Sequence, residues 1–460
     1  MPSIVQIERQ LRSLLGEQRV SVSASERSQH GQGESYHKAA PPDIVCWPTA
    51  TREVVEIVAL CRRTGACLIP FGAGTSLEGH VAALEGGVCI DMSRMKRILR
   101  VSLEDMDVHL EAGVTRLQLE RRLRTEGVFF PVDPGADATI GGMIATGASG
   151  TTTVRYGAMR DNVLSLTVVT ATGDVVRTRS RARKSSAGYD LTRLFIGSEG
   201  TLGIITDAVL RLHPVPQAMS AAICAYQALE DAVACAVQTI QSGVPVARIE
   251  LLDSLSIEAI NRRHGLEFSV RPTLFFEFHG TASAVIEQAT IVQEIAGACH
   301  ATGFEWTSEE DGRRRLWEVR HRALEAILAL RPGARGLMTD VCVPISALAA
   351  CIEETEDDLK ASGLVAPLVG HVGDGNFHLC LLIDPENAVE LAEAQSFGER
   401  LARRAIAFDG TCTGEHGVGY GKAGFLIVEY GDSGVDLMRA VKNAFDPTGI
   451  FNPGKVLPRV

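Results

Sequence analysis

The sequence predicts an α+β protein with more than one domain. Its 460 residues are enough for two or three domains with large cores. Short apolar runs alternate with segments of helical periodicity, a pattern typical of chains that combine sheets and helices. Glycine is also unusually frequent, with 45 residues, about a tenth of the chain where about 7% is usual. Sharp turns and close approaches of backbone to a ligand are therefore expected.

Charge, hydropathy and cysteine content exclude several classes of function. The 45 Lys and Arg residues against 56 Asp and Glu give a net charge of -11, which argues against nucleic acid as a partner. No apolar run approaches the roughly 18 residues of a transmembrane segment. The eleven cysteines are odd in number, scattered and without a CxxC pair, so buried free thiols in a reducing, cytoplasmic location are expected. Peripheral attachment to a membrane is the alternative.

The N-terminal residues 1–37 are predicted to form a helical segment. Their apolar residues recur at helical spacing: Ile4, Ile7, Leu11, Leu14 and Leu15. The acidic side chains of Glu8 and Glu17 argue against a transit peptide, so this helix is expected to pack on the body of the protein.

Residues 38–216 are predicted to form a first α/β domain. Strand patterns occupy residues 43–48, 66–70, 86–92, 107–113, 163–176 and 202–213, and helical patterns occupy residues 51–65 and 114–127. The stretch 135–157 has few large apolar residues, so it is predicted to lie as backbone against a ligand rather than in the core. Pro214 and Pro216 place the end of this domain at about residue 216.

Residues 217–425 are predicted to form a second domain. Strand patterns at 219–226, 247–253 and 272–280 alternate with helical patterns, which favours an antiparallel or mixed sheet with helices on one face. The last stretch, residues 426–460, is rich in Pro and Gly near its end and is predicted to fold back over the first domain.

Three glycine- and hydroxyl-rich segments of the first domain predict a site for a phosphorylated ligand. PFGAGTS at 70–76 follows a strand and offers successive backbone N–H groups that can surround phosphate oxygens. TIGGMIATGASG at 139–150 and GSEGTLGII at 197–205 repeat this composition, which points to a long ligand with a diphosphate. Neither a Rossmann fingerprint after a strand nor a P-loop is present. Glycines needed only for tight turns are the alternative.

The chain contains four motifs in fixed order: PFGAGTSLEG, DPGADATIGG, GSEGTLGIIT and NPGK. Through these motifs it resembles the FAD-binding oxidoreductases of the vanillyl-alcohol oxidase and p-cresol methylhydroxylase type. The resemblance extends from about residue 38 to the C-terminus. It implies an FAD-binding domain of two subdomains, an α+β cap domain with a mainly antiparallel sheet, and a C-terminal return to the FAD domain. The FAD contacts that it implies are Gly72, Ala73, Gly74, Thr75, Ser76, Pro134, Gly135, Thr139, Ile140, Gly142, Thr146, Ser149, Glu199, Gly203, Ile205 and Asn452. Relatives with covalent flavin often have a histidine where Thr75 stands, so non-covalent FAD is expected, with His80 as the nearby alternative.

A histidine pair in the second domain predicts a metal site. In GHVGDGNFHLC at 370–380, Asp374-Gly375 is a strong signal for a two-residue type I′ hairpin, which would place His371 directly opposite His378. GTCTGEHGVGYGK at 410–422 adds Glu415, and two His with one Glu can hold a divalent metal with positions open for substrate. The adjacent His416 could then act as a base. A structural histidine pair beside a glycine-rich surface loop is the alternative.

These two motifs resemble the D-2-hydroxyacid dehydrogenase branch of the FAD family. Within it, LWEVRHRALEAILALRPGARGLMTDVCVPIS at 316–346 is most similar to the D-lactate dehydrogenases that reduce cytochrome c or quinone. The resemblance implies His371, His378 and Glu415 as metal ligands, His416 as catalytic base and Arg320 as the partner of the substrate carboxylate. Arg331 and Arg335 are alternatives for that last role. Hydroxyglutarate-type relatives have Lys near Met338 and Asn at Cys380, so the residues here favour a monocarboxylate.

The expected activity is therefore an FAD- and divalent-metal-dependent oxidation of a D-2-hydroxy monocarboxylate, D-lactate foremost. The metal is expected to be zinc or manganese, with iron as an alternative. A hydride would pass from the substrate Cα to the flavin N5 while His416 takes the hydroxyl proton. The sequence has no CxxCH motif and no iron–sulfur cysteine cluster, so electrons are expected to leave to an external cytochrome, quinone, electron-transfer flavoprotein or dye. The alternatives are a flavin subunit of a glycolate oxidase-like complex, a D-2-hydroxyglutarate dehydrogenase and a flavin-free metallohydrolase.

Overall fold

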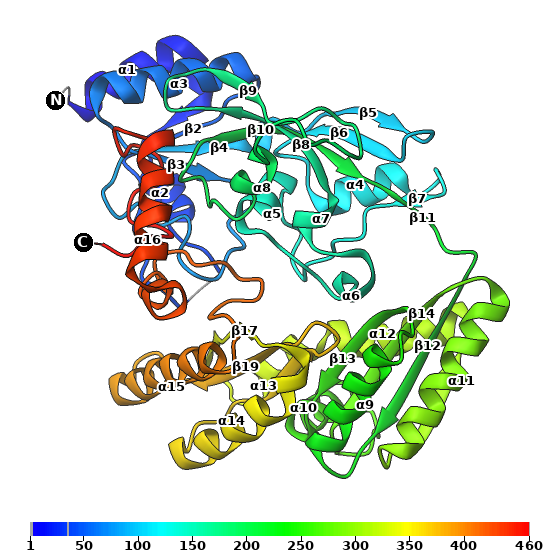
Figure 1. Cartoon of the computed structure of the whole chain (residues 1–460). Helices are drawn as coiled ribbons and strands as arrows, with labels where there is room; N and C mark the ends of the chain where they lie inside the picture. Colours follow the sequence, from blue (N-terminus) through cyan, green and yellow to red (C-terminus); the bar gives the residue numbers. More distant parts are fainter. Residues whose placement is uncertain (1–2, 35, 460) are drawn as a thin grey trace. The chain divides into compact units, whose positions relative to one another are not determined.

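The computed structural model describes residues 3–34 and 36–459, which divide into two compact units (Figure 1). Unit 1 comprises Met1–Gly150, Gly157–Val215 and Glu415–Val460, and unit 2 comprises Thr151–Tyr156 and Pro216–Gly414. The outermost residues of the predicted N-terminal and C-terminal segments, together with Ser35, lie outside the described residues.

Unit 1 begins with a small, mainly parallel sheet of order β1-β2-β4-β3. Its strands are β1 (Val20–Ser21), β2 (Ile44–Cys46), β3 (Leu68–Phe71) and β4 (Val88–Asp91), and its helices are α1 (Ile4–Leu15), α2 (Ala24–His30) and α3 (Thr51–Thr64). β4 pairs in parallel with both β2 and β3, while β1 is antiparallel to β2. Helix α1 buries Ile7, Leu11 and Leu15 in the same core as α3, so the predicted N-terminal helix packs on this sheet.

A second sheet of unit 1 is antiparallel, with the order β5-β6-β10-β8-β9. Its strands are β5 (Ile98–Ser102), β6 (Asp107–Glu111), β8 (Val163–Val169), β9 (Val175–Arg177) and β10 (Ile204–Arg211). The accompanying elements are α4 (Arg116–Leu123), α5 (Ile140–Thr146), α7 (Met159–Asn162), α8 (Leu191–Phe195) and the pair β7 (Val128–Phe129) and β11 (His213–Pro214). The two sheets of unit 1 confirm the predicted two-subdomain architecture.

The stretch 135–157 differs from its prediction because it contains helix α5. Ile140, Met143 and Ile144 recur at helical spacing and are almost completely buried in the core of the antiparallel sheet. Thr139 caps the first turn through its hydroxyl, and Gly147 ends the helix with a left-handed φ of +70°. The adjacent glycines in the first turn concealed this helix in the sequence. One of them is required by packing, since a Cβ on Gly141 would lie 2.7 Å from the Cβ of Ala112.

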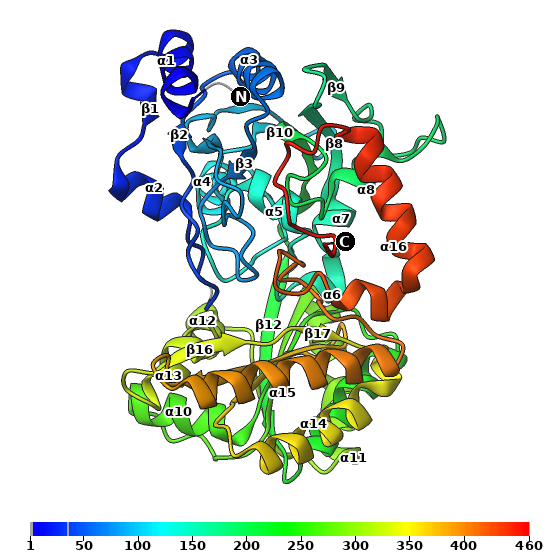
Figure 2. The same ribbon diagram turned by 90° about the vertical axis from the view of Figure 1, so that its left-hand side faces the viewer.

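The C-terminal stretch contains a long helix, α16 (Phe425–Phe445), where the sequence suggested mainly a loop-rich tail. The helix is interrupted at Gly431, whose φ is +68°. Figure 2 shows this helix in red together with α8, and the rings of Phe195 at the end of α8 and Phe445 at the end of α16 meet edge to face at 5.5 Å. Beyond the helix, Phe451 pairs with Leu68 of β3, so the chain ends on the first sheet of unit 1.

Unit 2 is built on one antiparallel sheet with the order β15-β12-β14-β13-β18-β19-β16, in which β17 also pairs with β19. Its strands are β12 (Ala218–Ala225), β13 (Val246–Leu252), β14 (Thr273–Gly280), β15 (Thr302–Thr307), β16 (Arg335–Met338), β17 (Val341–Cys342), β18 (Leu368–His371) and β19 (Asn376–Ile383). All pairings are antiparallel, which confirms the predicted sheet type.

The helices of unit 2 are α6 (Thr153–Tyr156), α9 (Leu229–Gln241), α10 (Ser254–His264), α11 (Ala282–Ala298), α12 (Glu310–His321), α13 (Ala323–Ala329), α14 (Leu348–Ser362) and α15 (Ala388–Ala407). Helix α11 lies along β12 and β14, and α9 contacts β13 (Figure 1). A buried apolar cluster joins Ile257 of α10, Trp317 of α12 and Ala326 of α13 to Phe275 and Cys380 of the sheet. The same sheet face also carries Glu250 of β13, two residues before Leu252 of the cluster, and His378 of β19, two residues before Cys380.

Candidate active site

The loop after β3 in unit 1 has the features of a diphosphate cradle. Among the described residues, the backbone N–H groups of 73–76 donate no hydrogen bond to the protein, and the buried hydroxyl of Ser76 has no partner. Gly72 and Gly74 are both required by the loop. A Cβ on Gly72 would lie 2.1 Å from the Oγ1 of Thr139, and Gly74 has a φ of +71°. Donors without protein partners in a glycine loop are what a bound phosphate needs, so these residues fit FAD.

Two residues with positive φ hold further segments of unit 1 together. Glu199 has a φ of 52° and accepts hydrogen bonds from the amides of Val418 at 2.7 Å and Gly419 at 2.9 Å. Asn452 has a φ of 39° and donates to the carbonyls of His80 at 3.2 Å and Glu199 at 2.8 Å. Both side chains bring distant segments of unit 1 together, and the Oδ1 of Asn452 is buried without a partner.

The other predicted FAD contacts fall into two groups. Gly203, Ile205 and Ile140 are buried in the protein core, where a Cβ on Gly203 would lie 2.7 Å from Val168. The remaining ones lie on or near α5: Pro134, Gly135, Gly142, Thr146 and Ser149. The hydroxyl of Ser149 donates to Glu415 of the same unit at 2.5 Å. The assignment of these residues to FAD stays a prediction, as does non-covalent attachment.

The predicted register of the histidine hairpin in unit 2 is wrong by two residues. His371 pairs with Asn376 and His378 pairs with Val369, because the loop spans the four residues 372–375. A type I′ turn needs a positive φ at both central residues, and Gly375 has one at 79° whereas Asp374 does not. The amide of Asp374 instead donates to the carbonyl of His371 at 3.0 Å, and Gly375 lies tightly against Val343.

The two histidines nevertheless share one face of the sheet, because a shift of two residues keeps the alternation of side chains. Their ring centroids are 5.4 Å apart. His378 donates from Nδ1 to the carbonyl of Thr339 at 3.0 Å, and His371 donates from Nδ1 to Glu250 at 2.7 Å. With both Nδ1 atoms bound to acceptors, Nε2 is the nitrogen through which either ring would ligate a metal.

Arg320 shares a carboxylate partner, Glu250, with His371 on this face. Its Nε and Nη2 donate to the Oε2 of Glu250 at 3.0 and 2.6 Å, while His371 occupies Oε1 of the same carboxylate. Burial by itself would raise the pKa of Glu250, but the charges of His371 and Arg320 hold it below its ordinary value. Glu250 is therefore an ionised group at the centre of the predicted site. Sequence reasoning missed it, although an acidic residue inside the apolar strand VARIELL was a usable signal.

Asp340 is a second residue of this region that sequence reasoning missed. It is buried, and it accepts hydrogen bonds from the amide of Asn376 at 2.8 Å and the hydroxyl of Thr413 at 2.7 Å. These contacts hold the start of the glycine-rich 410–422 segment on unit 2. Glu415 follows Thr413 by two residues within the same segment and is the residue at which the chain re-enters unit 1.

His416 is half-buried in unit 1. Nearby in that unit lies the buried carboxylate of Glu78. Burial raises the pKa of Glu78, but Lys422, His37 and His416 bring it below its ordinary value. The surroundings of His416 thus include an ionised acid and a lysine, a polar setting in which an imidazole can exchange protons.

A second cluster on the same sheet face contains Glu277, Arg248 and His279. Glu277 pairs directly with Arg248 in the register of β13 and β14. Its carboxylate lies 3.5 Å from the guanidinium of Arg248 and accepts from Nε2 of His279 at 2.8 Å. The Nδ1 of His279 is bonded to the hydroxyl of Tyr156 at 2.8 Å. Because both ring nitrogens are used, His279 is held as a structural histidine.

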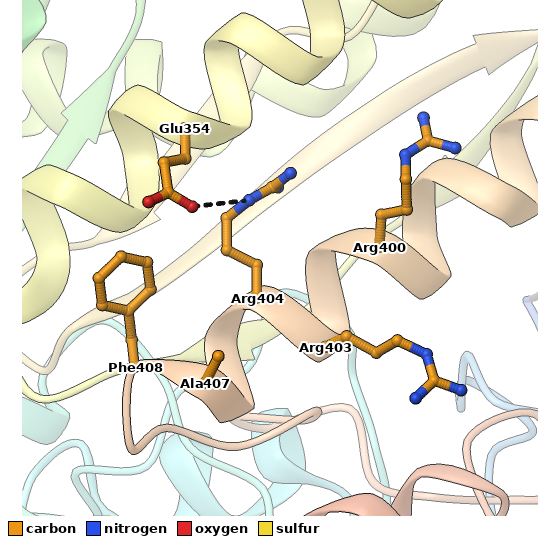
Figure 3. Close-up of a pocket in the computed structure, with 6 residues that line it drawn as sticks. All are labelled: Glu354, Arg400, Arg403, Arg404, Ala407 and Phe408. Carbon is orange, nitrogen blue, oxygen red and sulfur yellow. Dashed lines mark ion pairs between the residues drawn. The ribbon is translucent and has the colours of Figure 1, made fainter.

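A cavity of unit 2 lined by Arg400, Arg403 and Arg404 lies between α14 and α15 (Figure 3) and has a volume of about 430 Å³. Its arginines are largely neutralised. Arg404 pairs with Glu354 at 3.5 Å and with Asp358 at 2.8 Å, while Arg400 also pairs with Asp358. Arg403 points away from Glu354 in Figure 3. The cavity contains none of the predicted site residues.

The alternatives to Arg320 are placed elsewhere. Arg331 pairs with Glu390 and donates to the carbonyl of Leu382 at 2.9 Å, and Arg335 lies exposed on β16. All eleven cysteines are free, and burial raises the pKa of Cys380 to about 12, so this thiol is a packing residue. Within the described ranges, none of the helices combines the length and the apolar character needed to cross a bilayer.

Comparisons with known proteins define the class of this protein. Residues 215–456 match the C-terminal domain of the FAD linked oxidases, and residues 42–179 match an FAD binding domain. The fold is shared with 4-ethylphenol oxidase from Gulosibacter chungangensis, with a TM-score of 0.80 at 18% identity, over 98% of this chain and 97% of that one. It is also shared with p-cresol methylhydroxylase, with a TM-score of 0.79 at 17% identity, over 98% and 96% of the two chains. The chain belongs to the FAD-linked oxidases.

Its similarity to particular members of the family is high. It is 49% identical to the probable mitochondrial D-lactate dehydrogenase of Danio rerio, with 97% of this chain and 90% of that protein covered. Identity to the mitochondrial D-lactate dehydrogenase [cytochrome] of Arabidopsis thaliana is 47%, over 98% and 79% of the two chains. The glycolate oxidase subunit GlcD of Bacillus subtilis is 34% identical, over 91% and 89%. These relatives bear out the predicted resemblance to the D-2-hydroxyacid dehydrogenase branch.

Proposed function

We propose that the protein is an FAD- and divalent-metal-dependent dehydrogenase that oxidises D-lactate, or a similar D-2-hydroxy monocarboxylate, to the 2-oxo acid. The observation that carries this proposal is the cluster of His371, His378 and Arg320 on one face of the unit 2 sheet. The similarity to proteins named D-lactate dehydrogenase supports the substrate. A flavin-free metallohydrolase is disfavoured by membership of an FAD-binding family.

The metal ligands of this proposal are His371, His378 and Glu415. Two imidazoles whose Nδ1 atoms are bound to acceptors present Nε2 in a fixed orientation, which suits zinc or manganese. Glu415 is chosen because the contact of Thr413 with Asp340 anchors the chain two residues before it. The FAD supplies a hydride acceptor, and the metal supplies a Lewis acid that lowers the pKa of the substrate hydroxyl.

The protein's own residues then bind the acid and move one proton. Arg320 has five N–H donors and gives two hydrogen bonds to Glu250, so its other donors can bind the substrate carboxylate in a forked geometry. His416 accepts the proton of the substrate hydroxyl, since a neutral imidazole has a pKa near working pH.

The preference for a monocarboxylate rests on Met338 and Cys380. They pair directly on β16 and β19, and Cys380 follows His378 by two residues on the same face. Neither offers a charge or an amide to a second carboxylate. The electron acceptor is proposed to be an external cytochrome, quinone, flavoprotein or dye. The cytoplasmic location expected from the cysteines stays a prediction.

Anaerobic reduction of the flavin tests this function. The purified holoprotein is mixed with D-lactate, L-lactate, glycolate and D-2-hydroxyglutarate, and bleaching of the flavin absorbance is followed. Fast bleaching by D-lactate, slow bleaching by the others, and loss of the reaction after metal chelation with recovery on adding zinc or manganese are expected. Unchanged bleaching by D-lactate in metal-free protein would refute the metal's role. Reduction by D-2-hydroxyglutarate ahead of D-lactate would refute the proposed substrate.

A further inference from the structure

Glu250 is the residue through which the two halves of the proposed site are joined. It lies in the middle of β13 with no exposed surface. Its Oε1 accepts from His371 of β18 at 2.7 Å, and its Oε2 accepts from two N–H groups of Arg320 of α12. A single carboxylate therefore fixes a predicted metal ligand and the predicted partner of the substrate carboxylate.

We infer that Glu250 is a positioning residue that sets the metal-binding form of His371 and the orientation of Arg320, so that metal affinity and substrate affinity depend on the same side chain. This inference rests on the proposed function of the site and goes beyond it, because Glu250 touches neither metal nor substrate.

The tautomer of His371 gives the physical basis for the effect on the metal. A carboxylate can only accept, so the hydrogen bond at 2.7 Å places a proton on Nδ1 of His371. The lone pair that ligates a metal is then on Nε2. Hydrogen bonds of this kind also fix the ring plane and raise the basicity of the ligand, and their loss typically weakens metal binding by about 10- to 100-fold.

The geometry of Arg320 gives the basis for the effect on substrate. Two of its N–H groups contact one oxygen of Glu250, which restricts the rotation of the guanidinium. A guanidinium that is already held in one orientation loses less conformational entropy on binding a carboxylate than a mobile guanidinium does. Because Glu250 is a buried acid, it also gives the guanidinium of Arg320 an ion-pair partner, so that this charge does not lie unpaired beside the proposed metal ligand His371.

The chain contains a matched control for this inference in Glu277. It is a buried glutamate on the same sheet face, and it also contacts one histidine and one arginine. Its histidine, His279, uses the other ring nitrogen for Tyr156 and so has none for a metal. Glu250 and Glu277 are therefore both buried glutamates that contact one histidine and one arginine, and only the histidine bound to Glu250 belongs to the proposed metal site.

The test compares Glu250→Gln with Glu277→Gln in the full-length holoprotein. Metal per chain is measured by mass spectrometry during titration with a chelator, FAD per chain by absorbance, and KM and kcat with D-lactate and a dye. In Glu250→Gln, metal affinity is expected to fall by about 10- to 100-fold. KM is expected to rise several-fold at saturating metal, with FAD content unchanged. In Glu277→Gln, metal affinity and KM are expected to stay within twofold of the wild type.

The outcomes separate the inference from the proposed function. If the wild type binds no stoichiometric metal, the proposed function fails at its metal. If the wild type binds metal and Glu250→Gln binds it equally well with an unchanged KM, the inference is overturned while the proposed function stands. Equal losses in both variants would also overturn it, since they would indicate a general effect of buried glutamates. Should Glu250→Gln not fold, Glu250→Asp keeps the charge, shortens the reach to His371, and undergoes the same metal titration with the same criteria.

Discussion

The candidate cofactor region of unit 1 and the candidate metal region of unit 2 are built from different parts of the chain. In unit 1, the loop of residues 72–76 presents glycines and backbone N–H groups, and one added methyl group at Gly72 would collide with Thr139. In unit 2, Glu250, His371 and Arg320 present ionisable side chains held by hydrogen bonds from three elements. A site built from backbone groups needs free volume next to its glycines, whereas a site built from side chains needs the hydrogen-bond partners that orient them. Mutations in the two regions are therefore expected to weaken binding in different ways.

The difference extends to the two histidine clusters within unit 2. His371 and His279 each contact a buried glutamate, yet His371 does so through Nδ1 and His279 through Nε2. The remaining nitrogen of His279 is bound to Tyr156. Two clusters of similar residues on one sheet face can therefore have different roles, one in the proposed metal site and one structural. The role depends on which ring nitrogens of the histidine are bound to protein groups.

The largest expected effect is that of His371→Ala. Loss of one of the proposed ligands should reduce bound metal to a trace and lower D-lactate turnover by more than about 100-fold. FAD should be retained, because the candidate FAD cradle, the loop of residues 72–76, lies in unit 1. Metal analysis, flavin absorbance and a dye-linked assay measure the three quantities.

The matched control is His279→Gln, which removes the second histidine. Metal content and turnover should stay within about twofold, while the melting temperature falls because the buried hydrogen bonds to Glu277 and Tyr156 are disturbed. Metal loss in His279→Gln as large as in His371→Ala would mean that the two clusters are not functionally distinct.

A smaller effect, on the other region, is expected for Gly72→Ala. The new Cβ would lie 2.1 Å from the Oγ1 of Thr139. Rotation of that hydroxyl would remove the N-terminal cap of α5, which is worth about 1 kcal/mol. FAD affinity should fall by about tenfold or more, and turnover should recover as FAD is added, with no change in metal content.

Gly398→Ala is the control for this substitution. Gly398 lies inside helix α15, and nothing approaches the position of its Cβ within 4 Å. The change should leave FAD binding intact and raise stability slightly, since alanine favours a helix by about 0.5–1 kcal/mol over glycine. Fluorescence titration of the apoprotein with FAD distinguishes the two variants, and equal affinity in both would contradict a backbone cradle at Gly72.

The same contrast explains which features could be predicted from the sequence. The glycine loops could be predicted because a site built from backbone groups is encoded in consecutive residues. The strands could be predicted because their apolar residues follow a local pattern. Helix α5 was missed since its two glycines suggested a loop, although its apolar residues have helical spacing. The register of the His371 hairpin was predicted wrongly because contacts of Gly375 with Val343 decide the turn.

The role of Glu250 could not be predicted from the sequence, because its partners are distant. His371 is 121 residues away and Arg320 is 70 residues away. Only the order of strands β13 and β18 in the sheet brings the first pair together. A charged residue in an apolar strand indicates a buried partner but does not identify which one.

The smallest expected effect concerns a buried histidine–carboxylate pair of unit 1 that lies outside the proposed metal site. His30 contacts Asp91 at 2.9 Å, and Trp47 donates to the same carboxylate at 2.7 Å. Burial lowers the pKa of His30, but Asp91 and the carbonyl of Glu26 raise it above its ordinary 6.5. The stability that the pair contributes is therefore complete below pH 6.5 and is lost as the pH rises through the higher pKa of the folded state.

His30→Gln should accordingly remove part of the fall in melting temperature between pH 6 and 8.5, on the order of 1–3 °C. Metal content should not change, because unit 1 uses this pair to hold α2 against β4 rather than to bind a ligand. Thermal unfolding of the FAD-saturated protein at several pH values measures the effect. An unchanged pH dependence would show that His30 is neutral in the folded protein, and a loss of metal would show that ionisable pairs of unit 1 also support the metal site.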